Sequence, residues 1–87
     1  MYYVYVLKSV EHGLKYIGMT RNLKRRFLSH NRGDSLFTKK YKPFILLYYE
    51  AAVGEKDARA REKYLKSGMG RKYLMNRLKF FNGMESR

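Results

Sequence analysis

The first apolar positions of the chain predict a pair of β-strands. Aromatic and aliphatic residues fill Tyr2–Leu7, a composition typical of strands. A short polar connection over residues 9–13 separates this stretch from a second strand over Lys15–Thr20. Because two strands joined by a short loop usually pair side by side, the pattern predicts an antiparallel hairpin.

Alternation divides the side chains of each predicted strand between two faces. On the first strand, one face carries Tyr3, Tyr5 and Leu7, and the other carries Tyr2, Val4 and Val6. On the second strand, Tyr16, Gly18 and Thr20 share a face. The pattern alone does not place Tyr16 on the face of Tyr5, because that depends on the strand register.

The rest of the pattern predicts three helices and a third strand. Asn22 is a strong N-cap residue, and Leu23 and Phe27 would form the buried side of the helix that follows. In chain order, the pattern predicts a helix over Leu23–Asn31, a loop over Arg32–Pro43, a strand over Phe44–Tyr49, a helix over Gly54–Ser67 ended by Gly68, a helix over Arg71–Phe80, and a loose tail over residues 82–87. The third strand is apolar on both faces, so we expect it to be covered on both sides.

Residues Tyr16 to His30 combine a strand, a bare backbone position and a basic helix. Gly18 has no side chain, so another molecule's backbone could approach the strand there. Arg26 and His30 are spaced i,i+4 and share a helix face. This stretch therefore predicts a surface that faces an anion.

The predicted loop over Arg32–Pro43 supports two interpretations. Lys39, Lys40 and Lys42 are interleaved with Phe37 and Tyr41, which suits phosphate contacts combined with base stacking. Alternatively, the two rings attach a long loop to the core. The sequence favours neither interpretation over the other.

Glu62 lies on the same helical stripe as the apolar residues Ala58 and Leu65. A carboxylate pointing toward a core is costly unless it is paired or bound to a metal ion. On packing grounds alone we favour an ion pair, because Arg59, Arg61 and Lys66 lie nearby in the sequence.

Composition and charge narrow the class of partner. The chain has 87 residues, enough for one domain that buries roughly 60% of the unfolded chain's surface. Twenty Lys and Arg residues against seven Asp and Glu give a formal charge of +13. A charge this large on a small domain predicts a polyanionic partner and argues against a purely structural interaction domain.

Several classes of protein are excluded or disfavoured. The absence of cysteine excludes a disulfide scaffold and thiolate zinc sites, and two histidines argue against an all-protein zinc site. No apolar run is long enough to span a membrane, and the N-terminal residues lack a signal-peptide pattern. We therefore expect a cytoplasmic protein that does not bind membranes, monomeric by default.

Five elements of the sequence carry a resemblance to a known family. Tyr3-Val4-Tyr5 is followed by Tyr16-Ile17-Gly18, then by Arg26, His30 and a later helical Glu62. In order and spacing this resembles the GIY-YIG nuclease superfamily, and most closely its small single-domain members. The resemblance implies an α+β domain over residues 1–81, with a three-stranded antiparallel sheet flanked by helices in the order β-β-α-β-α-α.

The resemblance also implies an activity and a role for each matching residue. Members of the family hydrolyse phosphodiester bonds in DNA with one divalent metal ion, Mg²⁺ or Mn²⁺. Tyr16 would be the general base or its positioner, and Tyr5 would hold that tyrosine. Arg26 would neutralise the phosphoryl charge, His30 would assist in positioning or proton transfer, and Glu62 would hold the metal. On this reading the glutamate is a ligand rather than an ion-pair partner.

The chain departs from the family pattern at two points. The first motif reads Tyr3-Val4-Tyr5 rather than Gly-Ile-Tyr, although its last tyrosine is kept. Some members place an asparagine near the metal, and Asn76 lies in that region but opposite the stripe of Leu74 and Leu78. Many members also carry a separate DNA-recognition domain, which leaves room for a protein partner that supplies specificity.

Two functions of different classes follow from these observations. The first is a metal-dependent endonuclease acting on DNA, with branched, damaged or single-stranded DNA as candidate substrates. The second is a basic module of the same fold that binds DNA or RNA and cleaves weakly or not at all. Both would use generic contacts to the nucleic-acid backbone, for which the candidates are Lys15, Gly18, Lys24, Arg25, Lys39, Lys40 and Lys42. The joint presence of the five family residues favours the endonuclease.

Overall fold

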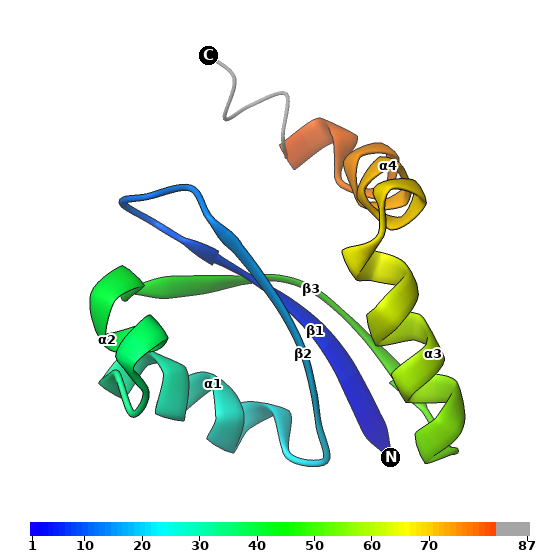
Figure 1. Ribbon diagram of the computed structural model, residues 1–87, viewed down its shortest axis with the longest axis horizontal. Helices are drawn as coiled ribbons and strands as arrows, with labels where there is room; N and C mark the ends of the chain where they lie inside the picture. The colour runs from blue at the N-terminus through cyan, green and yellow to red at the C-terminus, as the bar shows by residue number, and fades with distance from the viewer. Residues whose placement is uncertain (82–87) are drawn as a thin grey trace.

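The computed structural model describes residues 1–81 and has a sheet with helices on both sides (Figure 1). The elements are β1 (Tyr2–Ser9), β2 (Lys15–Thr20), α1 (Leu23–Arg32), α2 (Leu36–Tyr41), β3 (Phe44–Ala52), α3 (Glu55–Lys66) and α4 (Gly68–Arg77). The three strands lie in the order β2-β1-β3, and both neighbours run antiparallel to β1. The predicted α+β fold is confirmed. The predicted tail over residues 82–87 lies outside the described residues.

The register of the hairpin answers the question that alternation left open. Tyr5 pairs with Gly18 and Leu7 pairs with Tyr16. Residues directly opposite each other in an antiparallel pair project to the same face of the sheet. Tyr5 and Tyr16 therefore lie on the same face.

A β-bulge interrupts the pairing of β3 with β1. Val6 pairs with Tyr48, whereas the next residue, Leu7, pairs with Leu46, so Leu47 is left without a partner. Such an extra residue resets the alternation of the bulged strand. As a result, Leu46 and Tyr49 both face α1 although they are three positions apart.

The sheet separates two hydrophobic clusters. On one face, Val4 and Val6 of β1 pack with Ala58, Leu65 and Leu74 of α3 and α4. On the other face, Tyr5, Leu7 and Phe44 pack against Leu23 and Phe27 of α1. Figure 1 shows α1 and α2 together on one side of the sheet and α3 with α4 on the other. The expected buried face of α1 is thus observed.

The prediction that β3 is covered on both sides was wrong. β3 is an edge strand, and Ile45 and Tyr49 are 38% and 52% exposed. The strand also continues to Ala52, beyond the predicted end at Tyr49. An unbroken apolar run indicates a strand but does not distinguish a central strand from an edge strand that carries a bulge.

The predicted loop over residues 32–43 contains a helix, so that prediction was also wrong. Ser35 caps the N-terminus of α2, because its Oγ accepts from the backbone N–H of Thr38 while the Thr38 hydroxyl accepts from the backbone N–H of Ser35. Gly33, with φ of 76°, ends α1 just before it. The Ser-x-x-Thr spacing is the sequence signal for this reciprocal cap.

The boundary between α3 and α4 also differs from the prediction. Gly68 begins α4 rather than only ending α3, and α4 runs to Arg77 instead of spanning Arg71–Phe80. Ser67 separates the helices in an extended conformation and caps α4 by accepting from the backbone N–H of Gly70. A Cβ on Gly70 would collide with the backbone of Tyr64 and Leu65, so α4 packs directly on the end of α3.

Candidate active site

Two tyrosines and a histidine meet between the sheet and α1. The Tyr5 side chain is 2% exposed, and its hydroxyl lies 2.9 Å from Nε2 of His30. The ring centroids of Tyr16 and His30 are 4.8 Å apart, and those of Tyr5 and Tyr16 are 6.2 Å apart. β1, β2 and α1 therefore each contribute one ring to a single cluster.

Gly18 leaves room for the Tyr5 ring. A Cβ built on Gly18 would lie 2.5 Å from the Tyr5 hydroxyl oxygen and 2.7 Å from its Cζ. Any side chain at this position would displace the ring. The bare position therefore accommodates a side chain of the same molecule, whereas the sequence analysis expected an approach by another molecule.

Arg26 and Glu62 act electrostatically on this cluster. Burial is the main cause that raises the pKa of Tyr5; electrostatic interactions with Tyr16 and Glu62 raise it further, and the charge of Arg26 lowers it. Burial and, secondarily, the charge of Arg26 lower the pKa of His30 below its ordinary value of 6.5. Tyr5, Tyr16 and His30 thus meet directly, and Arg26 and Glu62 lie close enough to act on them electrostatically.

The two pKa shifts define how the Tyr5–His30 hydrogen bond is made. A raised pKa keeps the Tyr5 hydroxyl protonated at neutral pH, and a lowered pKa keeps His30 neutral. Tyr5 can therefore donate its proton to Nε2 of the imidazole. Tyr5 is suited to hold the cluster together, and it is a poor candidate for a base that takes a proton from water.

Glu62 already forms an ion pair. Lys66 Nζ lies 3.0 Å from Oε2 of Glu62, one helical turn along α3, and the glutamate side chain is 22% exposed. The other two cations considered from the sequence pair elsewhere, Arg59 with Glu55 and Arg61 with Glu50. The ion pair expected on packing grounds is present, with Lys66 as the partner.

Glu62 is the carboxylate that would bind a divalent metal ion at this site. Residues 1–81 contain no group of three or more His, Cys, Asp or Glu side chains that could hold a metal. A site at Glu62 would therefore rely on a single protein carboxylate. That suits Mg²⁺, which keeps several of its waters and takes further oxygen ligands from substrate phosphates.

A basic hollow adjoins Arg26 and has a volume of about 430 Å³. It is lined by the turn after β2 and the outer side of α1, with Thr20, Arg21, Asn22, Arg25, Arg26, Ser29 and Arg32. Arg25 belongs to the set predicted from the sequence. Arg21 and Arg32 were missed, and the only signal for them was their position at the two ends of α1.

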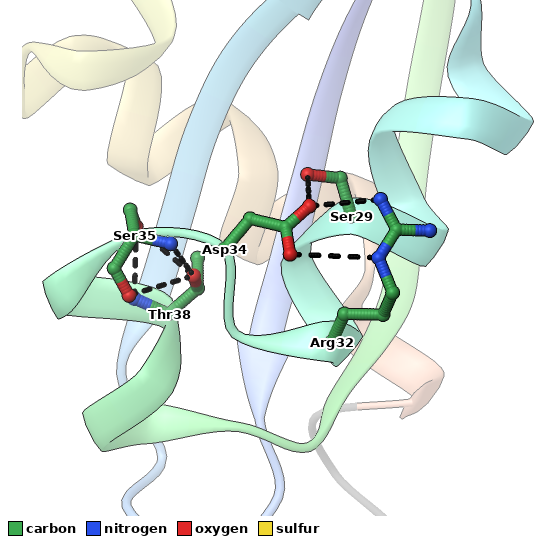
Figure 2. Close-up of polar contacts among 5 residues, drawn as sticks. All are labelled: Ser29, Arg32, Asp34, Ser35 and Thr38. Carbon is green, nitrogen blue, oxygen red and sulfur yellow. Dashed lines mark hydrogen bonds and ion pairs between the residues drawn. The ribbon is translucent and has the colours of Figure 1, made fainter.

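Asp34 orients the side chains at the C-terminal end of this hollow. Figure 2 shows its carboxylate between Ser29 and Arg32. Ser29 donates its hydroxyl to Oδ2 at 2.7 Å, and Arg32 donates through Nη2 to the same oxygen at 2.8 Å. Hydrogen bonds from the Arg32 guanidinium and, secondarily, from the Ser29 hydroxyl lower the pKa of the Asp34 carboxyl, so the ion pair persists as the solution becomes more acidic.

The aromatic residues of α2 attach this helix to the core and to Tyr16. Phe37 lies 5.4 Å from Tyr16 and 4.9 Å from Tyr41 between ring centroids. Tyr41 is half-buried and packs against the cluster of Tyr5, Leu7 and Phe44. The attachment of this segment by its rings is therefore observed, and base stacking on Phe37 stays a prediction.

The remaining predicted contacts lie around the site at different places. Lys15 lines a groove of about 650 Å³ beside Tyr16, together with Phe37, Lys66 and Arg71. Lys24 lies on a different side of α1 from Arg26, in a hollow next to β3. Lys39 and Lys40 are on α2, and Lys42 follows it. Asn76 is exposed on α4.

No helix within residues 1–81 is both long and apolar enough to cross a membrane.

Comparison with known proteins finds one family model and several relatives that match most of the chain. The model of the GIY-YIG catalytic domain matches residues 1–78. UPF0213 protein CPE1444 of Clostridium perfringens is 39% identical over 67 residues, which cover 76% of this chain and 71% of the relative. The UPF0213 protein in the ldhD 5′ region of Pediococcus acidilactici is 38% identical over 81 residues, which cover 86% of this chain and 82% of the relative.

A solved structure is similar in fold as well as in sequence. The solution NMR structure of the UPF0213 protein BH0048 from Bacillus halodurans superimposes with a TM-score of 0.54 at 29% identity. The match covers 87% of this chain and 84% of that one. With the family model matching nearly the whole chain and the site residues clustered as described, the chain belongs to the GIY-YIG catalytic domain family.

Proposed function

We propose that this protein is a divalent-metal-dependent endonuclease that hydrolyses phosphodiester bonds in DNA. The observation that carries the proposal is the contact of Tyr5 with His30 and Tyr16, within electrostatic reach of Arg26 and Glu62. A permanent cation, a carboxylate and a partly exposed phenol around one site are groups that phosphoryl transfer uses. The charge of +13 supports a polyanionic substrate.

Each residue has a distinct part in the proposed reaction. Arg26 binds the phosphoryl oxygens and neutralises the charge that builds on them. Tyr16 orients the attacking water or, once ionised to the phenolate, accepts its proton, since its half-exposed side chain lies beside His30. The water oxygen bonds to phosphorus, the bond to the leaving oxygen breaks, and that oxygen takes up a proton. Tyr5 and His30 hold the geometry through their hydrogen bond.

Glu62 would hold the metal ion, which when bound supplies Lewis-acid stabilisation of the phosphate and helps to ionise a neighbouring hydroxyl. The protein's own contribution is one carboxylate within electrostatic reach of Tyr5, paired with the cation of Lys66. Lys66 would have to give up part of its contact with Glu62 for metal to bind.

The ion pair with Lys66 also supports a second candidate function. If Lys66 keeps Glu62 occupied, the protein would bind nucleic acid through its basic surface and cleave weakly or not at all. A partner protein or a particular DNA structure would then be needed for activity.

The test is cleavage of a labelled panel of duplex, single-stranded, flapped and branched DNA, together with RNA. Reactions with Mg²⁺, Mn²⁺ and EDTA would compare the wild type with Glu62→Gln and Arg26→Ala. Two matched controls come from α3, Glu55→Gln and Arg59→Ala, because Glu55 and Arg59 form an exposed i,i+4 ion pair away from the cluster. Circular dichroism would verify that every variant is folded.

We expect metal-dependent cleavage that both site variants abolish and both controls retain. Cleavage that continues in EDTA, or that survives Glu62→Gln, would contradict the proposed role of the metal. No cleavage of any substrate, with binding that survives Glu62→Gln, would favour the binding module.

A further inference from the structure

A second hollow lies next to the basic hollow, on the same face of the sheet as the catalytic cluster. It has a volume of about 490 Å³ and lies between α1 and the edge strand β3. Its walls include Tyr3, Tyr49 and Leu46 of the sheet and Phe27 of the helix. A volume of this size lies in the range of pockets that hold small ligands. None of the residues placed in the catalytic cluster lines it.

The aromatic lining of this hollow is available for contact. Tyr49 is 52% exposed, and its ring meets Tyr3 edge-on with centroids 6.1 Å apart. Neither phenol hydroxyl forms a hydrogen bond with another residue in the described part of the chain. The hollow therefore offers an exposed ring for stacking and two hydroxyls for hydrogen bonding.

The charge at the rim points to an anionic ligand. Arg21 and Lys24 line the hollow, and no acidic side chain does. Within residues 1–81, neither cation forms an ion pair. The guanidinium of Arg21 lies 5.1 Å from the ring of Tyr2, which projects from the other face of the sheet, so Arg21 lines the hollow only at its edge. An aromatic wall next to uncompensated cations is the combination that binds a nucleobase with its phosphate.

The two hollows share residues at the N-terminus of α1. Arg21 and Asn22 line both the aromatic hollow and the basic hollow that contains Arg26. A strand whose phosphates contact the arginines near Arg26 can therefore continue past this end of the helix into the aromatic hollow. A base can enter only if it is unpaired, because a paired base is held in the stack of the duplex.

We propose that the hollow formed by Tyr3, Tyr49, Leu46 and Phe27 binds an unpaired nucleobase of the strand whose phosphates contact the arginines of α1. This placement rests on the proposed nuclease function, since the phosphate bound at Arg26 defines the path of the strand. The hollow then selects substrates that carry an unpaired nucleotide at a fixed position from the bound phosphate.

The test measures binding rather than cleavage, so its result does not depend on activity. Fluorescence anisotropy in EDTA would give the affinity for a labelled oligothymidine and for a fully paired, blunt-ended duplex. Tyr49→Ala should weaken binding of the oligothymidine about tenfold and leave duplex binding unchanged. Tyr49→Phe should retain the wild-type affinities, because it keeps the stacking ring. Phe80→Ala is the matched control, since Phe80 is an exposed aromatic residue outside the hollow.

A second measurement uses the wild-type protein alone. An oligonucleotide in which the bases are replaced by abasic sites should bind about as weakly to the wild type as oligothymidine binds to Tyr49→Ala. The ring protons of Tyr3 and Tyr49 should also shift in NMR spectra when oligothymidine is added, and remain unshifted with the abasic strand. This arm is informative even if Tyr49→Ala fails to fold.

The outcomes separate this proposal from the proposed function. Equal loss of affinity for both ligands in Tyr49→Ala, or no loss for either, overturns the nucleobase hollow, whether or not DNA is cleaved. The expected selective loss supports the hollow even if no metal-dependent cleavage is found, in which case only the endonuclease proposal fails. An abasic strand that binds as tightly as oligothymidine also overturns the hollow.

Discussion

The hydroxyl oxygen of Tyr5 lies 2.9 Å from Nε2 of His30, and both side chains are almost fully buried. This bond joins the central strand of the sheet to the last turn of α1. Because both groups are shielded from water, loss of either partner leaves the other without a hydrogen bond. The bond therefore serves folding and the arrangement of the candidate site at once.

Replacement of Tyr5 by phenylalanine tests the structural part of this role. Tyr5→Phe keeps the ring that packs over Gly18 but removes the donor to His30. We expect the free energy of unfolding to fall by about 1–2 kcal/mol, measured by urea denaturation. Tyr49→Phe removes an exposed hydroxyl and should change stability by less than about 0.5 kcal/mol. Equal effects of the two substitutions would contradict a contribution of the Tyr5–His30 hydrogen bond to stability.

Protonation of His30 should make stability depend on pH. Burial and the neighbouring Arg26 lower the pKa of His30 in the folded protein below 6.5. A group with a lowered folded pKa contributes stability that is fully present above the unfolded value and is lost as pH falls through the folded value. We therefore expect the free energy of unfolding to decrease as pH falls below 6.5.

Urea denaturation across this pH range would measure the effect. His30→Gln should remove the part of the pH dependence of the free energy of unfolding that His30 causes. His12→Gln should retain that pH dependence. A wild-type curve that stays flat from pH 6.5 downward, until the carboxylates titrate, would refute the prediction. Glu50 would add a separate loss in more acidic solution, because Arg61 lowers its pKa.

Gly18 should not tolerate a side chain. In Gly18→Ala, the new Cβ would press on the Tyr5 ring, and such overpacking costs about 1–3 kcal/mol. Gly68→Ala is a suitable control, since a Cβ there meets no atom within 4 Å and the residue lies in the first turn of α4. Thermal unfolding of both variants would measure the difference, and a Gly18→Ala protein as stable as the wild type would show that the ring can move away.

Arg61 should contribute more to stability than its neighbour Arg59. Arg61 donates from Nε and Nη2 to Glu50 of β3 at 2.9 and 2.8 Å. Its guanidinium also lies 4.9 Å from the ring centroids of both Tyr64 and Tyr73, so it connects β3, α3 and α4. Arg59 only pairs with Glu55 one turn away, at an exposed position.

We expect Arg61→Ala to destabilise the protein by about 2 kcal/mol and Arg59→Ala by less than about 0.5 kcal/mol. Chemical denaturation at one ionic strength would compare the two variants on the same helix. Similar losses from both would mean that the contacts of Arg61 to β3 and α4 add little.

The elements with a strong local signal were predictable from the sequence. The hairpin, α1 and α3 follow from strand-forming residues, the Asn22 cap and a long helical pattern, and their observed bounds differ by one residue or a few. By contrast, α2 is a six-residue helix whose only signal is the Ser35–Thr38 cap. The break between α3 and α4 depends on backbone packing at Gly70, which no periodicity reveals.

The candidate site was predictable as a set of residues and not as a geometry. The motifs named Tyr5, Tyr16 and His30, which meet in the structure, and Arg26 and Glu62, which act on Tyr5 electrostatically. The partners within the set depend on register and on distances between elements, so the bond from Tyr5 to His30 could not be inferred. The aromatic hollow was missed because Tyr49 reaches the α1 face only through the bulge in β3.

That bulge makes the length of β3 as important as its composition. Leu47 is the one residue in the paired part of β3 without a partner in β1. A regular pairing that kept Leu47, opposite Leu7, would shift Phe44 and Leu46 by one position and turn both toward the opposite face of the sheet, away from α1. Deleting Leu47 would instead join Leu46 directly to Tyr48 and keep the observed pairs without a bulge. The strand should therefore tolerate the loss of this one residue better than the insertion of another residue along it.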